Sequence, residues 1–390
     1  MNKPKQSPQK GFYPCLIACC QSDCDPLVVA SLANEVENWG EFIDSAYSHG
    51  VFPLVYPKLK RLEILDERLK ARMKKINWSI ASSNIMMTAE LIRVVALLRD
   101  HGIRSIAIKG PVLAQMIHGD VTQRQFSDLD LLVEPSQMYP ALELLSHHGY
   151  ASQYPIEFLK NKTLLKVGKD FPTTHTTKGV LIEFHWRLFL DRSIKKSKID
   201  LFSPLNHHCT LQREKIETLQ LDALLLYLLL HGSKHYWERL EWIVDVDRLI
   251  RLHESIINWD ALYAMAEEME ISFMVYLGLA VTHELLHTPL EAIAHHRIAT
   301  DSHVLKSKET IIRELNSDAI TKDPSEHISM ENLNKVLLLR DSTHGWVRNY
   351  LLTLFQIKEL DVYVVNLPHW LSSLYYGVRL YRLIKENLLK

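Results

Sequence analysis

One segment constrains this chain more than any other, because residues 128–133 read Asp-Leu-Asp-Leu-Leu-Val. Successive side chains of a β-strand point to opposite faces. Asp128 and Asp130 therefore share one face, and the other face carries Leu129, Leu131 and Val133. The segment predicts a strand that packs its leucine and valine side chains into a core and presents two carboxylates on the opposite side.

Two carboxylates on one strand face suit a divalent cation. Mg²⁺ prefers oxygen ligands at about 2.0–2.1 Å and is usually held by one or two carboxylates together with the phosphates of a substrate. Asp128 and Asp130 are therefore candidate Mg²⁺ ligands. An acid-apolar-acid triplet also fits a simpler alternative, in which the acids only mark the solvent side of a buried strand.

A candidate phosphate site precedes this strand. Residues 103–108 read as a short apolar strand that ends at Lys109-Gly110-Pro111, and residues 112–117 continue at helical spacing. Proline fits the first helical position, because that position needs no N–H donor. A glycine turn that leads into a helix N-terminus presents backbone N–H groups and a positive dipole end, which attract phosphate. Lys109 adds a positive charge there, although Lys109-Gly110 is also compatible with a plain tight turn and a solvated lysine.

A third acid follows on a second strand. Residues 180–187 alternate, with Val180, Ile182, Phe184 and Trp186 on one face and Leu181, Glu183, His185 and Arg187 on the other. A carboxylate beside the aspartate pair can ligate a second metal or accept a proton from an attacking hydroxyl. Glu183 is a candidate for both roles if the two strands are neighbours. The alternative is that Glu183 lies on the exposed side of an edge strand.

A helix is expected between these two strands. It opens at Glu134-Pro135-Ser136 and stops at Gly149, which predicts Ser136 as its N-cap and Gly149 as its C-terminal cap. The segment 151–178 contains Pro155, Gly168 and Pro172, which predicts a loop, a short helix and a hairpin whose turn ends near residue 179.

A polar stripe farther along suggests a different chemistry. Its residues recur at steps of four, three, four and three, which predicts a single helix with one polar face: His231, His235, Glu238, Trp242 and Asp245. Two histidines four apart can chelate zinc, so a metal-dependent hydrolase using His231, His235 and Asp245 is a second hypothesis. The His-Glu-x-x-His pattern is absent because Gly232 follows His231, which favours a stripe that contacts nucleotide or acceptor.

Charge, cysteine content and apolar runs limit the partners and the location expected for the protein. The net charge is −1, from 45 basic and 46 acidic residues, so the whole chain lacks the strongly basic character of many nucleic-acid binders, although tRNA stays open as a partner. Five cysteines without a signal-like leader predict a reducing, cytoplasmic location, and those at 15, 19, 20 and 24 fit apolar packing better than a zinc site. The longest apolar run, Ala223–Leu230, is too short to span a bilayer, so no membrane partner is expected.

Several motifs along the chain occur together in one known family. Those of the core are Ile108-Lys109-Gly110, Arg124, Ser127-Asp128-Leu129-Asp130-Leu131-Leu132-Val133, His147-His148-Gly149-Tyr150 and Glu183-Phe184-His185-Trp186. Those that flank the core are Trp39, Ala46, His49-Gly50-Val51 and Pro53-Leu54 before it, and His231, His235, Trp237, Leu240, Trp242 and Asp245 after it. With these motifs the chain resembles the uncharacterised nucleotidyltransferase family of bacteria, within the polymerase-β-like nucleotidyltransferase superfamily, over roughly residues 30–260.

The resemblance implies a reaction and a set of residues. A nucleoside monophosphate would move from a nucleoside triphosphate such as ATP to a hydroxyl, with release of pyrophosphate. The catalytic residues and metal ligands would be Asp128, Asp130 and Glu183, with Mg²⁺, or Mn²⁺ in its place. The nucleotide-binding residues would be Lys109, Gly110, Arg124 and Ser127, and candidate substrate-binding residues are His185, His231, His235 and Trp242.

The resemblance leaves the acceptor open among a protein, a tRNA and a small molecule. A third hypothesis is a non-catalytic nucleotide-binding protein with the same fold. We expect an α+β fold in which a small mixed nucleotidyltransferase sheet is flanked by helices. The expected divisions are a partly disordered lead at 1–25, a helical N-terminal region at 26–98, the nucleotidyltransferase core at 99–190 and a helical C-terminal region at 191–390.

Overall fold

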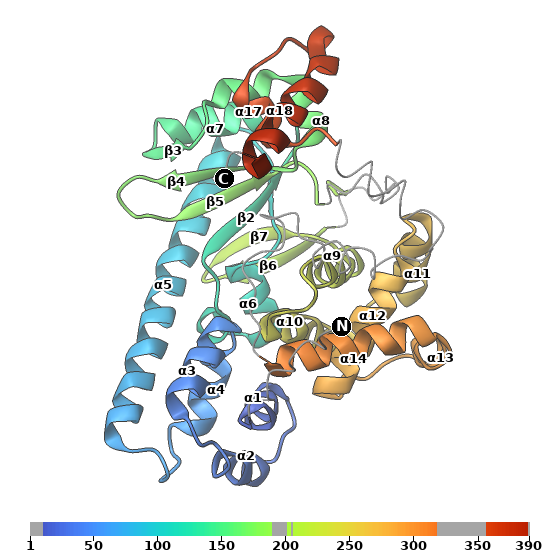
Figure 1. Ribbon diagram of the computed structural model, residues 1–390. Coiled ribbons are helices and arrows are strands. Elements are labelled where there is room, and N and C mark those ends of the chain that lie inside the picture. The colour runs from blue at the N-terminus through green and yellow to red at the C-terminus, as the bar shows by residue number, and fades with distance from the viewer. Residues whose placement is uncertain (1–10, 189–200, 204–205, 318–355, 389–390) are drawn as a thin grey trace.

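The computed structural model describes residues 11–188, 201–203, 206–317 and 356–388. It is an α+β fold in which helices surround a five-stranded mixed sheet and a separate two-stranded hairpin (Figure 1). The predicted fold class is confirmed. Of the lead expected at residues 1–25, residues 1–10 lie outside the described residues.

The sheet has the strand order β1-β2-β5-β4-β3. Its strands are β1 (Ser105–Ala107), β2 (Asp128–Val133), β3 (Tyr150–Ser152), β4 (Asp170–His175) and β5 (Leu181–His185). Strands β2 and β5 are parallel, and the other neighbouring pairs are antiparallel. In the parallel pair Asp130 lies directly opposite Glu183, which confirms that the strand carrying Glu183 is the neighbour of the aspartate pair.

Each face of the sheet packs on its own helices. The apolar face, with Leu129, Leu131 and Val133, shares a core with α5 (Glu67–Asp100) and α7 (Met138–Ser146). The acidic face is covered by α9 (Leu221–Lys234) and α10 (Leu240–His253), whose core includes Leu132. Figure 1 shows α5 along one side of the sheet and α9 and α10 on the other. The carboxylates of β2 therefore lie between the sheet and α9.

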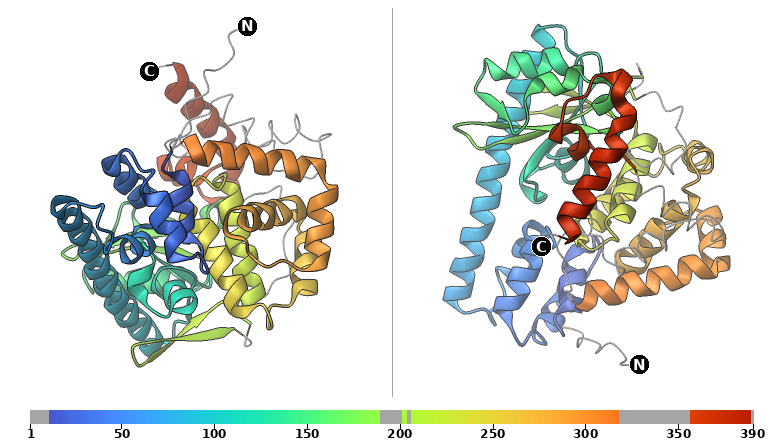
Figure 2. Two further views of the ribbon diagram at one scale, coloured as in Figure 1. Left: turned by 90° about the horizontal axis from the view of Figure 1, so that it is seen from below. Right: turned by 45° about the horizontal axis from the view of Figure 1, so that its top comes forward.

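The remaining elements lie at the N-terminal end of the chain, in its middle and at its C-terminal end. At the N-terminal end lie α1 (Tyr13–Cys20), α2 (Pro26–Ala33), α3 (Trp39–Ser48) and α4 (Phe52–Leu59). Within the middle of the chain lie α6 (Pro111–His118), η1 (Val121–Gln123), η2 (Ile156–Lys160), α8 (Lys162–Val167), β6 (His207–Leu211), β7 (Glu214–Thr218), α11 (Trp259–Glu268), α12 (Ser272–Leu286), α13 (Ala292–Thr300) and α14 (Ser302–Ser317). The C-terminal elements α17 (Glu359–Val364), η4 (His369–Leu374) and α18 (Tyr375–Leu388) lie at the opposite end of the molecule from α1–α4 (Figures 1 and 2).

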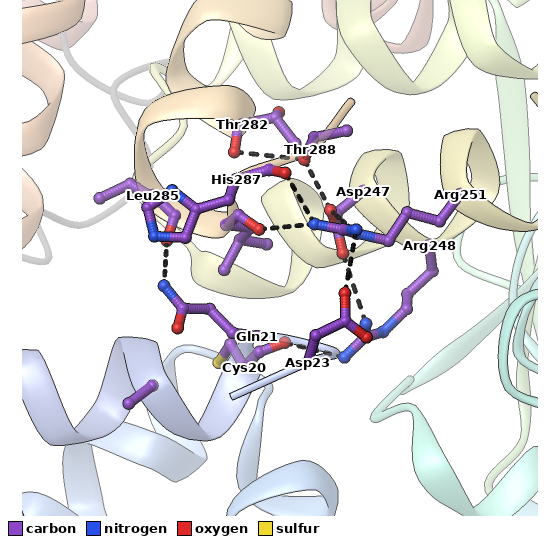
Figure 3. Close-up of polar contacts among 12 residues, drawn as sticks. Cys20, Gln21, Asp23, Asp247, Arg248, Arg251, Thr282, Leu285, His287 and Thr288 are labelled. Carbon is purple, nitrogen blue, oxygen red and sulfur yellow. Dashed lines mark hydrogen bonds and ion pairs between the residues drawn. The ribbon is translucent and has the colours of Figure 1, made fainter. Parts of the chain in front are cut away.

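A buried polar junction joins the N-terminal helices to α10 and α12 (Figure 3). The carboxylate of Asp247 is fully buried and accepts hydrogen bonds from Arg251 Nε at 2.8 Å and Thr288 Oγ1 at 2.6 Å. Arg248 Nη2 donates to the carbonyl oxygen of Cys20 at the end of α1, at 2.8 Å. Because buried polar groups need partners, these bonds favour one orientation of α10 relative to α1 and α12.

The start of α10 is held by a turn near the N-terminus. The amide of Glu241 donates to the carbonyl oxygen of His49 at 3.0 Å. Gly50 has a φ of +72°, and a Cβ there would lie 1.9 Å from Glu241 Oε2. Glycine suits this turn, because it adopts positive φ without strain and leaves room for the Glu241 side chain. Two motifs about 190 residues apart in the sequence, His49-Gly50 and the start of α10, therefore form one contact.

The single helix expected over residues 231–245 is wrong. Helix α9 ends at Lys234, Tyr236 and Trp237 have φ values of +57° and +54°, and α10 begins at Leu240. The indole of Trp237 is fully buried in contact with Gly232, where an added Cβ would lie 2.4 Å from the ring. Packing of this indole accounts for the break, since the left-handed residues turn the chain so that the ring enters the core.

Three smaller expectations also differ from the structure. The hairpin β6–β7 lies in the region expected to be helical, because Cys209, Leu211 and Ile216 alternate with more exposed residues and pack into the core of the sheet. Helix α7 begins at Met138, and its N-cap is Gln137 without a side-chain bond, so Ser136 is not the cap. Gly149 has a φ of +86°, but the C-cap of α7 is His147, two residues earlier.

The N-terminal cysteines pack as expected. Cys15, Cys19 and Cys20 are buried in the same core as α9 and α10, and Cys24 is partly buried. All of them are free thiols. They behave as small apolar side chains.

Helix α5 has the length and hydropathy that a membrane span needs. It is the one helix in the described part of the chain with this property, and 44% of its apolar window is buried. Its buried residues, among them Met87, Leu91 and Val94, contact the sheet. The packing is that of the core helix of a globular domain.

Candidate functional site

Three ligand-type side chains meet on the acidic face of β2 and β5. His185 Nε2 lies 2.8 Å from Asp130 Oδ1 and 3.6 Å from Glu183 Oε2. Ligand atoms of these three side chains all lie within 4.8 Å of one another, and no other such group occurs among the residues that the structure describes. Two carboxylates and an imidazole in this arrangement fit a divalent cation.

The two aspartates of β2 differ in their electrostatics. Burial disfavours the charge of Asp130, but the hydrogen bond from His185 and the nearby positive charges, among them that of Lys109, together outweigh burial and lower the pKa of Asp130 to about 2. The pKa of Asp128 is raised by its own burial and by the nearby charge of Asp130. Asp130 is therefore the firmly ionised member of the pair. Asp128 lies beside the group of Asp130, Glu183 and His185 without belonging to it.

A second acidic pair lies on the far side of His185, and no local sequence pattern predicted it. Asp170 faces His185 across β4 and β5, with Oδ2 3.8 Å from His185 Nδ1. Lys169 forms an ion pair with Asp170, and its amide donates to Glu359 Oε1 of α17 at 3.1 Å. Burial and the charge of Asp170 raise the pKa of Glu359 to about 7. The C-terminal segment thus contacts the edge of the site, from nearly 190 residues away in the sequence.

The predicted phosphate turn lies beside β2. Gly110 has a φ of +59° and is the N-cap of α6, with Pro111 at the first helical turn, as predicted. Lys109 Nζ lies 4.9 Å from the ring centre of Tyr227. Burial lowers the pKa of Lys109, although the charge of Asp130 partly offsets this effect. Within the described ranges Lys109 forms no salt bridge, and the acids whose charges act on it are Asp130, Asp245 and Asp128.

Arg124 is held by an acid on α10. Its Nε donates to Asp245 Oδ1 and its Nη2 donates to Asp245 Oδ2, each at 2.8 Å, and both side chains are buried. Asn84 of α5 also donates to the carbonyl oxygen of Arg124, at 2.7 Å. The hydrolase hypothesis needs Asp245 as a metal ligand, but both of its oxygens are bound to this guanidinium. Ser127, at the entry to β2, is exposed.

Three aromatic rings from α9, from its C-cap residue and from α10 form a cluster. The ring centres of His231 and His235 are 4.8 Å apart, and Trp242 lies 5.3 Å and 5.2 Å from them. Burial, followed by the charge of Lys109, lowers the pKa of His231 well below its usual value, which keeps the ring neutral. The break before α10 thus still brings Trp242 to the two histidines.

Tyr227 is a further residue near the acids that the sequence patterns did not predict. It is one turn before His231 on α9, and its ring centre lies 6.0 Å from that of His231. Burial, and then the charges of Asp130 and Glu183, raise its pKa, so the phenol stays protonated beside the acids. Its spacing of four residues from His231 is a signal that could have identified it.

A cavity of about 330 Å³ lies elsewhere, between β1 and the hairpin β6–β7. Two of its lining cations are paired, Arg99 with Glu214 at 3.6 Å and Arg104 with Glu217. Their charge is therefore neutralised within the protein, and the cavity is separate from the acidic group.

A stability measurement tests whether the charge of Glu183 destabilises the metal-free fold. Burial and the charges of Asp170 and Asp130 raise the pKa of Glu183, so its ionisation at neutral pH destabilises the metal-free fold. We expect Glu183→Gln to increase the free energy of unfolding at pH 7 by about 0.5–2 kcal/mol. The destabilisation caused by ionised Glu183 is absent below the unfolded pKa of glutamate, about 4.3, and complete above the raised pKa of the folded state. The added stability of Glu183→Gln should therefore vanish near pH 4.

Urea unfolding without divalent metal at both pH values measures this effect. Glu157→Gln, at an exposed position, is the control and should change stability little at either pH. A Glu183→Gln variant that is less stable than the parent at pH 7 would contradict the electrostatic account.

Comparison with known families identifies one match. A family model described as an uncharacterised nucleotidyltransferase matches residues 35–287, about two thirds of the 390-residue chain. The match includes β1–β7, α9, α10 and the group of Asp130, Glu183 and His185. No curated protein and no solved structure matches the chain. Glu359 and α17 lie outside the matched residues.

Proposed function

The chain belongs to the uncharacterised nucleotidyltransferase family, and from this premise we propose a metal-dependent transfer of a nucleoside monophosphate to a hydroxyl. The observation that carries the proposal is the pairing of Asp130 with Glu183 on adjacent parallel strands, with His185 beside both. This donor set fits a divalent cation, Mg²⁺ or Mn²⁺. When bound, such a cation neutralises charge on the triphosphate and helps to orient it.

The side chains around the acids support a division of roles. Lys109 and the backbone of Gly110, at the N-terminus of α6, would hold phosphate oxygens. Asp128 and Asp130 would orient the metal side of the triphosphate. The ring of Tyr227 would keep the ammonium of Lys109 beside the acids, through the cation–π contact.

The proposed reaction balances as a single displacement. The acceptor oxygen forms a bond to the α-phosphorus, the bond from that phosphorus to the bridging oxygen breaks, and pyrophosphate leaves. The proton of the acceptor hydroxyl goes to Glu183. Glu183 lies opposite Asp130 and beside His185, so a carboxylate oxygen of Glu183 that does not bind the metal is available to accept this proton.

The aromatic cluster supports a place for the organic part of a substrate. Trp242, His231 and His235 gather flat rings near enough to Lys109 for its charge to act on His231, and such rings stack on nucleobases or on aromatic acceptors. We propose ATP or another nucleoside triphosphate as donor. The acceptor would be a cytoplasmic protein, a tRNA or a small molecule that carries a hydroxyl.

Label transfer tests the function directly. Each α-³²P-labelled nucleoside triphosphate is incubated with the purified chain and a bacterial lysate, with Mg²⁺ or Mn²⁺ present. We expect one triphosphate to give a labelled protein, RNA or small molecule, and the signal to vanish with excess chelator. Lysate without the added chain is the matched control, because endogenous kinases and polymerases also transfer label. A γ-labelled triphosphate should give no band that depends on the added chain, because its label leaves in pyrophosphate.

Other results would favour the remaining hypotheses. Saturable triphosphate binding without any transfer would favour the non-catalytic nucleotide-binding protein. Release of inorganic phosphate that depends on His231 and His235, without label transfer, would favour the hydrolase.

A further inference from the structure

We propose that His185 is a direct ligand of the metal, so that the site binds a transition-metal dication such as Mn²⁺ more tightly than Mg²⁺. The proposal rests on the metal dependence proposed above and specifies the chemistry of that same site. It changes the role expected for His185 from substrate contact to metal ligation.

The spacing of the three side chains supports ligation. Ligands at about 2.1 Å from a metal and at right angles to each other are separated by about 3.0 Å. His185 Nε2 is 2.8 Å from Asp130 Oδ1 and 3.6 Å from Glu183 Oε2, which brackets that separation. The three groups therefore need only small side-chain movements to share one cation.

The other ring nitrogen of His185 faces the carboxylate of Asp170, which a small side-chain movement would bring within hydrogen-bond distance. A metal-bound histidine usually directs its second N–H at a carboxylate, which fixes the ring and the tautomer. Asp170 Oδ2 lies 3.8 Å from His185 Nδ1, on the side away from Asp130. Asp170 is itself held by Lys169. In the metal-free site Nε2 donates to Asp130, so metal binding displaces the Nε2 proton. The proton that remains on Nδ1 then leaves Nε2 to bind metal between the two acids.

Burial makes this nitrogen a firm part of the site. The side chain of His185 is 4% exposed and that of Asp130 is 9% exposed, so neither can turn to solvent. Mg²⁺ is a hard cation that prefers oxygen and keeps several waters, whereas imidazole suits transition metals. A buried nitrogen donor at this position therefore favours the transition metal.

Pulsed electron paramagnetic resonance of bound Mn²⁺ tests the proposal without turnover. The full chain, labelled with ¹⁵N-histidine, should show a ¹⁵N coupling to Mn²⁺. His185→Gln retains an amide that can donate to Asp130 but lacks the ring nitrogen, so it should bind Mn²⁺ without the coupling. His175→Gln, on β4 and outside the group, is the control and should keep it. Mn²⁺ bound without the coupling in the parent, or with it in His185→Gln, would overturn the proposal.

A competition titration gives a second measurement. We expect the parent to prefer Mn²⁺ over Mg²⁺ by at least about tenfold and His185→Gln to lose most of this preference. If His185→Gln does not fold, His185→Asn replaces it, and the coupling in the parent still decides whether a histidine is bound. Coupling without label transfer would remove the transferase function and leave the ligand assignment. Label transfer without the coupling would leave the transferase function and remove His185 as a metal ligand.

Discussion

An Asp130→Asn variant is expected to lose nucleotidyl transfer by about 10³-fold or more, because removing one charged group that stabilises a transition state typically has this effect. Asp130 has a pKa of about 2, so it carries a full negative charge throughout the neutral range. Asparagine has nearly the same shape and can still accept the hydrogen bond from His185. The substitution therefore removes charge and metal affinity with little change in packing.

The rate of label transfer from the preferred triphosphate measures this loss. Asp100→Asn, whose side chain is 71% exposed on the end of α5, is the matched control and should transfer at the parental rate. Circular dichroism and thermal unfolding verify that both variants fold. Transfer by Asp130→Asn within about tenfold of the parent would exclude Asp130 as a principal charge of the reaction.

Arg124→Met is expected to destabilise the protein by about 3–5 kcal/mol, because it leaves the buried charge of Asp245 without a partner. The two side chains are only 7% and 2% exposed and form a two-point contact, so water cannot replace the guanidinium. The pair also connects the loop before β2 to α10. Its loss should loosen the segment that leads into Asp128.

A double variant separates the charge effect from packing. Arg124→Met combined with Asp245→Leu removes both charges, and we expect it to recover most of the lost free energy of unfolding in urea. A single Arg124→Met variant less than about 1 kcal/mol below the parent would contradict the buried-pair account. The affinity of the double variant for the triphosphate then distinguishes a structural arginine from the nucleotide-binding residue that the family resemblance implies.

Local periodicity predicted the elements that carry the chemistry. Alternation placed the acids of β2 and β5 on polar faces, and Pro111 after Gly110 correctly marked the start of α6. These features are local, because strand alternation and helix initiation depend on residues only a few positions apart. The family resemblance added the likeness to nucleotidyltransferases, and the family match confirms it.

Local periodicity could not predict contacts between segments that are far apart in the sequence. Asp170 and Glu359 reach the site from β4 and α17, and nothing in their local sequence marks them as acids near a metal. The pairing of Arg124 with Asp245 is equally non-local. Periodicity also failed over residues 231–245, because burial of the Trp237 indole favours two left-handed residues over a continuous helix.

The sequence by itself determined that two acids lie on one strand face, that a third lies on a second strand, and that a glycine turn precedes them. Strand geometry requires this, since its period of two depends on the backbone alone. Only the tertiary structure decided that β5 lies parallel to β2 with Glu183 opposite Asp130, and that His185 approaches both acids. Strand order and register depend on how helices from both ends of the chain pack over the sheet, and that packing is a property of the whole fold.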